Sequence, residues 1–174
     1  MTGIINVDTI QNNGGTTALS IDSTGRVSTP ARPSFFAYVD TSDSSDTDYT
    51  SVTQVDFDAV QHNIGGHFDL STNKFTAPVS GVYQFNWQVR LYQVQSASTV
   101  NAQLRLNGLA HWGNSLYVYG GLEDPQGGHY ASPGSSVTVQ IDAGDEIDVW
   151  FNAAGDTTVR LQYAGTFFSG FLVG

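Results

Sequence analysis

The sequence predicts an all-β protein, and three observations support this. Asp outnumbers Glu fourteen to two, there is one Lys, and Gly, Ser and Thr are abundant, a composition that disfavours helices. Pro78, Ser80-Gly81 and Gly65-Gly66 divide the chain into short segments separated by turns. Within residues 82–92, large apolar residues alternate with polar ones, which places five of them on one face of a strand: Tyr83, Phe85, Trp87, Val89 and Leu91.

Length and charge limit the possible functions. A chain of 174 residues suits one sizeable domain with an appendage. A net charge of −10 argues against nucleic acid or anionic membrane as a partner, and the absence of Cys excludes a disulfide framework. The start of the chain has no basic region or long apolar run, so we expect no signal peptide and no membrane insertion. We expect a soluble chain made in a reducing cytosol.

Residues 1–31 form a separate N-terminal arm in this interpretation. Short apolar segments at 4–10 and 17–21 are separated by the turn Asn12-Asn13-Gly14-Gly15, and a second turn at 23–25 precedes Arg26-Val27. Strands this small cannot form their own core, so we expect them to pack on other copies of the chain or on another protein. The alternative is a solvated tail.

The head is expected to span residues 32–174 and to begin with a strand at 32–39. An acidic loop follows at 40–48, where Asp43, Asp46 and Asp48 are weak candidates for a calcium site. Their spacing does not match the twelve-residue calcium loop, so a solvated loop is the preferred interpretation. No other metal site and no cofactor are expected.

The remaining strands of the head follow at regular intervals. Residues 100–107 alternate, and Asn107-Gly108 predicts a tight hairpin into 109–112. A short apolar segment at 117–119 precedes a long loop at 120–134. Further strands are expected at 137–141, 146–153, 158–163 and 166–173. About ten strands and no helix indicate an antiparallel two-sheet sandwich.

Two of these strands are apolar on both faces, namely residues 35–39 and 166–173. A strand of an antiparallel sandwich needs only one apolar face, so the second face requires a cover. A loop could supply it, but association between subunits explains it better.

The chain resembles the globular domain of the complement component 1q family, a relative of the tumour necrosis factor jelly roll. The resemblance covers residues 32–174 and includes segments 144–150 and 167–172. Its signature comprises Phe57, Asn63, Phe68, Phe75, Gly81, Tyr83 and Phe85, with Trp87 where the family usually has Phe or Tyr. These residues should supply much of the core.

The resemblance implies a jelly-roll homotrimer whose first and last strands face the threefold axis. The candidate interface residues are Phe35, Phe36, Tyr38, Arg105, Phe167, Phe168 and Phe171. Animal members often follow a collagen stalk, but no Gly-X-Y repeat occurs here. The arm resembles N-terminal segments of bacteriophage fibre-like proteins instead.

No motif for catalysis is present. The four His residues are scattered, no Gly-x-Ser-x-Gly occurs, and Asp145 and Glu146 point to opposite faces of an extended strand. We therefore expect a non-enzymatic, trimeric structural or binding protein on the surface of a phage virion, made in the host cytoplasm. It would be a capsid decoration or a fibre or spike tip that binds a host glycan or protein through its 40–49 and 119–134 loops, with residues 1–31 attached to another virion protein. The alternative is a free bacterial lectin-like trimer.

Overall fold

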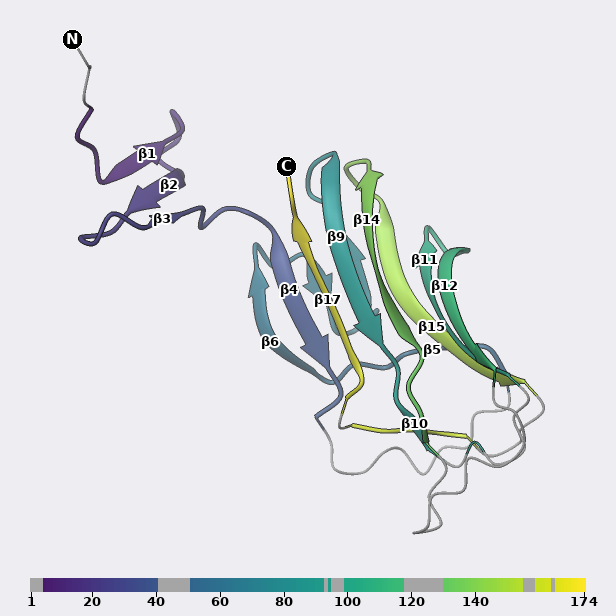
Figure 1. Cartoon of the computed structure of the whole chain (residues 1–174). Coiled ribbons are helices and arrows are strands. Elements are labelled where there is room, and N and C mark those ends of the chain that lie inside the picture. Colours follow the sequence, from purple (N-terminus) through teal and green to yellow (C-terminus); the bar gives the residue numbers. More distant parts are fainter. Residues whose placement is uncertain are drawn as a thin grey trace.

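The structure, a computed structural model, describes residues 5–40, 51–92, 94, 99–117, 130–154, 159–163 and 165–174. Strands and no helices are found in this part of the chain, which confirms the all-β prediction. Two antiparallel sheets lie face to face in the head (Figure 1). The count exceeds the predicted ten because the structure contains several strands of only two or three residues.

The first sheet of the head has five strands in the order β14-β9-β17-β4-β6. Tyr83, Phe85 and Trp87 of the central strand β9 are buried, as the alternation predicts. Gly170 of β17 lies opposite Phe85 and Phe35, and a Cβ added there would approach Phe85 Cδ1 to 2.5 Å. The strands are β4 Ser34–Tyr38, β6 Ala59–Ile64, β9 Gly81–Gln88, β14 Gly134–Ile141 and β17 Phe167–Leu172.

The second sheet has the order β12-β11-β15-β8-β7, and β5 also pairs with β15. The predicted turn at Asn107-Gly108 is confirmed, because φ is 51° and 79° at these two residues. The hairpin is longer than predicted, since its second strand continues to Tyr117. The strands are β5 Thr53–Gln54, β7 Phe68–Asp69, β8 Lys74–Thr76, β11 Thr99–Leu106, β12 Leu109–Tyr117 and β15 Glu146–Ala154.

An aromatic core fills the space between the sheets. The ring of Phe35 stacks on Phe68 at 4.9 Å and on Phe75 at 5.0 Å, and Phe168 meets it edge-on at 4.8 Å. Asn63 closes one side of this cluster, because its side chain both donates to the Phe68 carbonyl (2.8 Å) and accepts from the Phe68 amide (3.1 Å). All six aromatic residues of the predicted signature are buried: Phe57, Phe68, Phe75, Tyr83, Phe85 and Trp87.

The strand predicted at 82–92 is divided in two. Strand β9 ends at Gln88, and β10 (Leu91–Tyr92) joins a small third sheet with β13 (Tyr130–Ala131) and β16 (Arg160–Leu161). Between them the Arg90 amide donates to the Thr166 hydroxyl at 3.0 Å instead of to a ladder partner. The burial pattern was still predicted correctly, because Val89 and Leu91 are both fully buried.

The N-terminal arm forms its own antiparallel sheet in the order β1-β2-β3, namely Thr9–Gln11, Thr17–Ile21 and Val27–Ser28. The side chains of Asn12 and Asp22 hold its two turns. Asn12 Oδ1 accepts hydrogen bonds from the amides of Gly14 and Thr16, and Asp22 Oδ1 accepts them from the amides of Thr24 and Arg26. The described residues show no hydrogen bond between 5–28 and the head, and the arm stands beside it in Figure 1.

Candidate interaction face

The outer surface of the five-stranded sheet carries four aromatic side chains. Strand pairing places Tyr38 beside Phe167 on this surface. Phe35 and Phe168 occupy alternate positions of the same two strands and point into the core. Phe36 and Phe167 stack at 5.6 Å, and Phe36 lies 6.1 Å from Tyr38. Phe171 is 43% exposed. We refer to Phe36, Tyr38, Phe167 and Phe171 as the aromatic face.

Two shallow hollows border the aromatic face. One of about 330 Å³ lies at the end of β4 and β17, lined among others by Tyr38, Tyr163 and Phe167. The second, of about 290 Å³, is lined by Phe36, Tyr38 and Gln61. Side chains from another molecule can therefore enter between these rings as well as lie across them.

The other half of the same sheet surface is polar. Residues Gln84, Asn86 and Gln88 of β9 lie beside Phe171, Ser169 and Phe167 in register. Asn86 donates to Ser169 at 3.4 Å, and Gln88 donates to the Gly165 carbonyl at 2.9 Å. The surface thus has an aromatic side on β4 and β17 and an amide-rich side on β9.

The structure corrects two of the seven predicted interface residues and places a third, Arg105, on the other sheet, where its role in an interface stays a prediction. Phe35 and Phe168 belong to the core, being 1% and 0% exposed. Arg105 lies on β11 of the second sheet, and its guanidinium stacks on Trp150 at 3.9 Å, so it is not part of the aromatic face. Gly170 is the residue that could have separated the inward-facing from the outward-facing aromatics of β17. A larger side chain at this position would collide with core rings, so the glycine marks the inner face of the strand.

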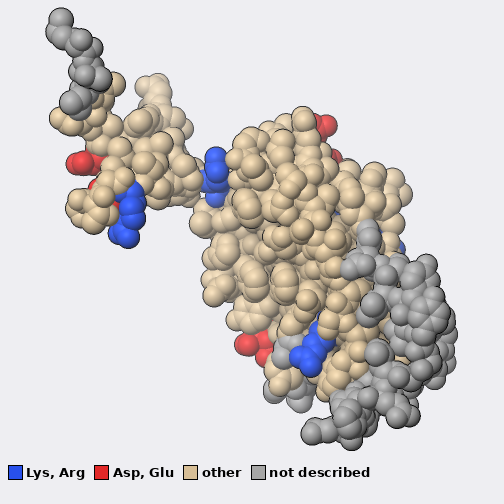
Figure 2. All heavy atoms as spheres, viewed as in Figure 1, with Lys and Arg blue, Asp and Glu red and all other residues tan. Residues whose placement is uncertain are grey.

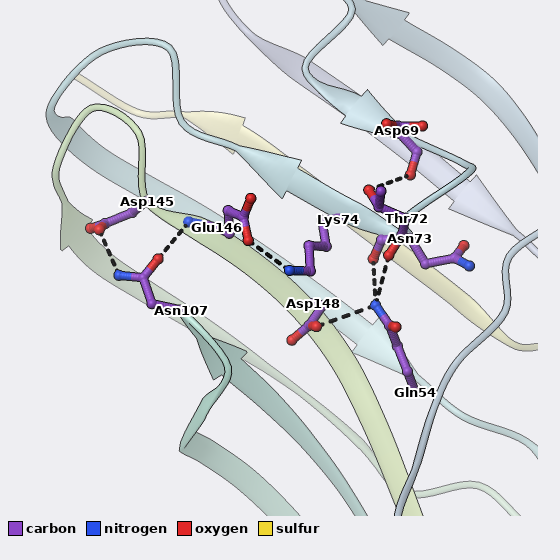
Figure 3. Close-up of polar contacts among 9 residues, drawn as sticks. All are labelled: Gln54, Asp69, Thr72, Asn73, Lys74, Asn107, Asp145, Glu146 and Asp148. Carbon is purple, nitrogen blue, oxygen red and sulfur yellow. Dashed lines mark hydrogen bonds and ion pairs between the residues drawn. The ribbon is translucent and has the colours of Figure 1, made fainter.

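The second sheet carries a polar network on its outer surface (Figure 3). Lys74 and Glu146 form an ion pair of 2.6 Å, which raises the pKa of Lys74. Asn107 donates to Asp145 at 2.9 Å, and this bond lowers the pKa of Asp145. Gln54 links the Thr72 carbonyl (2.9 Å) to Asp148 Oδ2 (3.2 Å). The network joins β5, β8 and β15 with the turn that follows β11.

Asp148 is the unusual member of this network, and its burial was not predicted from the sequence. It is 4% exposed, and burial raises its pKa despite the opposing influence of Trp150, Lys74 and Arg105. Asp148 Oδ1 and Trp150 Nε1 are buried without a hydrogen bond of normal geometry among the described residues. Asp148 and Trp150 share the outer face of β15. Their other neighbours are brought to them only by the pairing of β15 with β5, β8 and β11, which no local pattern indicates.

No group of three or more His, Cys, Asp or Glu side chains that could hold a metal ion occurs among the described residues. The weak calcium candidates Asp43, Asp46 and Asp48 lie outside those residues, as do most of the loops at 40–49 and 119–134. In the described part of the chain, no helix is long and apolar enough to span a membrane.

Comparison with known proteins identifies the family. The C1q domain model matches residues 34–173. The chain belongs to the C1q domain family. It is 32% identical over 126 residues to complement C1q tumor necrosis factor-related protein 5 of Rattus norvegicus, covering 70% of this chain and 46% of that protein. It is 28% identical over 113 residues to the uncharacterized protein YqcC of Bacillus subtilis, covering 62% of this chain and 30% of that protein.

Solved structures agree on the fold. The globular domain of zebrafish complement 1qA protein matches with a TM-score of 0.59 at 14% identity, over 82% of this chain and 98% of that one. Murine APRIL at pH 8.0 matches with a TM-score of 0.58 at 16% identity, over 82% of this chain and 99% of that one. The predicted jelly-roll sandwich is therefore confirmed.

Family membership also bears on function. The C1q and tumour necrosis factor family is non-enzymatic, as expected for this chain, and its domains typically form trimers. The chain spans less than half the length of the curated relatives named above. The family match begins at residue 34 and so leaves out the arm, whose phage-like character remains a prediction.

Proposed function

We propose that the chain is a non-enzymatic, homotrimeric binding head whose N-terminal arm holds it on a larger assembly. The single observation that supports it most is the aromatic face. Four aromatic side chains on one sheet surface, with hollows between them, form an apolar patch of the kind that marks a protein interface. Trimer formation would bury this face and leave the polar network of the second sheet outside.

The arm favours attachment to a partner. Strand pairing puts Ile10, Leu19, Ile21 and Val27 on one face of its sheet, and Val27 is 59% exposed. Thr9, Ser20 and Ser28 lie on the opposite face, where the two serine hydroxyls bond at 2.6 Å. A unit of about thirty residues seldom buries enough apolar surface to be stable alone, so the apolar face of the arm needs a partner.

We propose a phage virion as the assembly, with the head displayed on the virion surface. The support is the resemblance of the arm to phage fibre-like segments, together with a bacterial relative of the head. A free bacterial lectin-like trimer is the alternative, and it would leave the apolar face of the arm without a docking partner.

Two measurements test the proposal. Light scattering of the purified full chain at micromolar concentration should give three times its 18.7 kDa mass. A stable monomer would overturn the trimer. Antibodies against residues 32–174 should label intact phage particles by electron microscopy. Trimers found only in the particle-free fraction would overturn the virion assignment and favour the free binding protein.

A further inference from the structure

The larger hollow beside the aromatic face combines aromatic rings with a carboxylate. Four aromatic residues line it together with Asp40, namely Phe36, Tyr38, Tyr163 and Phe167. Tyr163 is 41% exposed and Asp40 is exposed as well, so both can meet a molecule that enters from solvent. We refer to this hollow of about 330 Å³ as the strand-end pocket.

Hydrogen bonds of the backbone hold the segments that form the strand-end pocket. The Val39 amide donates to the Thr166 carbonyl at 3.2 Å, which ties the end of β4 to the segment before β17. The next amide, that of Asp40, donates to Asp58 Oδ1 at 2.7 Å. The position of Asp40 is therefore fixed before a ligand arrives, which reduces the entropy lost on binding.

Gly165 shapes the side of the pocket that carries Tyr163. Its φ of 108° lies in the region that favours glycine, and its carbonyl accepts from Gln88 Nε2 at 2.9 Å. A Cβ added there would come within 3.2 Å of Gln88 Nε2 and 3.4 Å of Arg90 Cδ. The glycine thus lets this segment lie close against β9 while Tyr163 lines the pocket.

The charge at the pocket is negative. Among the described residues that line it there is a carboxylate, Asp40, and no Lys or Arg. Arg90 lies behind Gly165, but its guanidinium is placed over the ring of Tyr130, 4.7 Å from the centroid, and does not line the pocket. The chain as a whole carries a net charge of −10. A cation is therefore attracted to the pocket, and an anion is repelled.

The pocket lies at the end of the head away from the arm. Strand β4 begins beside the junction with the arm and runs to Tyr38, where it borders the pocket (Figure 1). Figure 2 shows a mostly uncharged face of the head, on which acidic atoms reach the surface near the lower end of β4. Asp40 and Tyr163 can therefore be reached from the end of the head that would meet a target.

We propose that the strand-end pocket binds a small organic cation that carries a quaternary ammonium group. The methyl groups of such a cation would pack against the aromatic rings, and its charge would be attracted by the ring faces and by Asp40. A pocket of about 330 Å³ lies at the lower end of the range of roughly 300–1,000 Å³ typical of ligand sites, which favours a small ligand. This inference rests on the proposed binding function and names its ligand class, but it does not depend on the oligomeric state.

The test uses the full chain and choline as the probe. Calorimetry should show saturable binding of choline. The neutral carbon analogue, in which a tert-butyl group replaces the trimethylammonium group, has the same shape without the charge and should bind at least about tenfold more weakly.

Two variants and two matched controls locate the site. Tyr163→Ala and Asp40→Asn should each weaken choline binding about fivefold or more, because one removes a ring and the other the carboxylate. Tyr130→Ala, an exposed tyrosine outside the pocket, and Asp142→Asn, an exposed acid in the turn between β14 and β15, should leave binding unchanged.

Four results would overturn the proposal. They are absence of choline binding to the wild-type chain, equal binding of the neutral analogue, undiminished binding by Tyr163→Ala and Asp40→Asn, and equal loss in Asp142→Asn, which would indicate non-specific charge attraction. Light scattering on the same samples separates this inference from the trimer. A monomer that binds choline would refute the trimer alone, and a trimer that does not bind choline would refute the strand-end site alone.

Discussion

Phe36 and Phe167 stack on the outer surface of the five-stranded sheet, with ring centroids 5.6 Å apart and planes inclined by 10°. They belong to the first and last strands of the head, which pair along β4 and β17. Their sequence neighbours Phe35 and Phe168 form an equally close pair on the inner surface, at 4.8 Å. The same two strands therefore supply both the core and the aromatic face.

Replacing Phe167 by Ser should dissociate the oligomer while leaving the head folded, because the side chain lies outside the core. Light scattering at micromolar concentration should then give the 18.7 kDa mass of one chain, with an unchanged β-sheet circular dichroism spectrum. Phe168→Ser is the matched control one residue away. It places a hydroxyl in the core and should unfold the head. A Phe167→Ser protein that keeps the wild-type mass would show that the aromatic face is not the interface.

Replacing Phe85 by Ala should destabilise the head by about 3–5 kcal/mol, because the fully buried ring is lost and leaves a cavity. Gln140→Ala, on the exposed side of β14, should change the unfolding free energy by less than about 0.5 kcal/mol. Urea unfolding followed by tryptophan fluorescence measures both, at one protein concentration because association adds to the apparent stability. Similar midpoints for the two variants would contradict the assignment of Phe85 to the core.

The sequence predicted the core better than it predicted the surface. Alternation in β9 identified Tyr83, Phe85 and Trp87, because a period of two is a local property of a strand. In β17, however, both faces carry aromatic residues, so alternation alone does not tell which face is buried. Gly170 decides it, because a side chain there would collide with Phe85 of the neighbouring strand. Asp148 and its hydrogen-bond partner Gln54 lie on strands far apart in the chain. Such sites depend on topology, which no short pattern encodes.

Asp148 should make the head more stable at mildly acidic pH than at neutral pH. Burial raises its pKa, so the native state holds this proton more tightly than the unfolded chain does. The resulting stability is complete below the ordinary Asp value of 3.8 and is lost as the pH rises through the raised pKa. Asp148→Asn removes the titration. Its unfolding free energy, measured in urea between pH 4 and about 7, should gain on that of the wild type as the pH rises.

Asp145 provides the control of opposite sign. The hydrogen bond from Asn107 lowers its pKa, so its contribution is present above 3.8 and is lost as the pH falls through the lowered pKa. Asp145→Asn should therefore lose stability relative to the wild type at neutral pH and converge with it in acid.

The prediction for Asp148 has its own contrary outcome. If the difference in unfolding free energy between the wild type and Asp148→Asn did not change with pH, Asp148 would have an ordinary pKa.

Deleting residues 1–31 should leave the trimeric head folded but abolish its attachment. The cut preserves the hydrogen bond from the Leu172 amide to the Pro33 carbonyl (3.1 Å). Among the described residues, the only hydrogen bond that it breaks between the two parts is the one from the Arg32 amide to the Thr29 carbonyl. Circular dichroism of residues 32–174 should show a folded β-sheet protein, and light scattering should give three times the mass of the truncated chain. Co-sedimentation with phage particles, the assay for attachment, should be lost.

Two substitutions in the full-length chain separate the apolar face of the arm from its length. Ile10→Ser removes an exposed apolar side chain and should weaken co-sedimentation, because this face has to be buried against a partner. Thr9→Ala lies on the opposite face and should have no effect. If the truncated head still occupied the particle, or if it failed to fold, the arm would not be an anchor. If Ile10→Ser bound as well as the wild type, attachment would have to use the turns or the polar face, where Asn12, Asp22 and the paired serines already have hydrogen-bond partners within the arm.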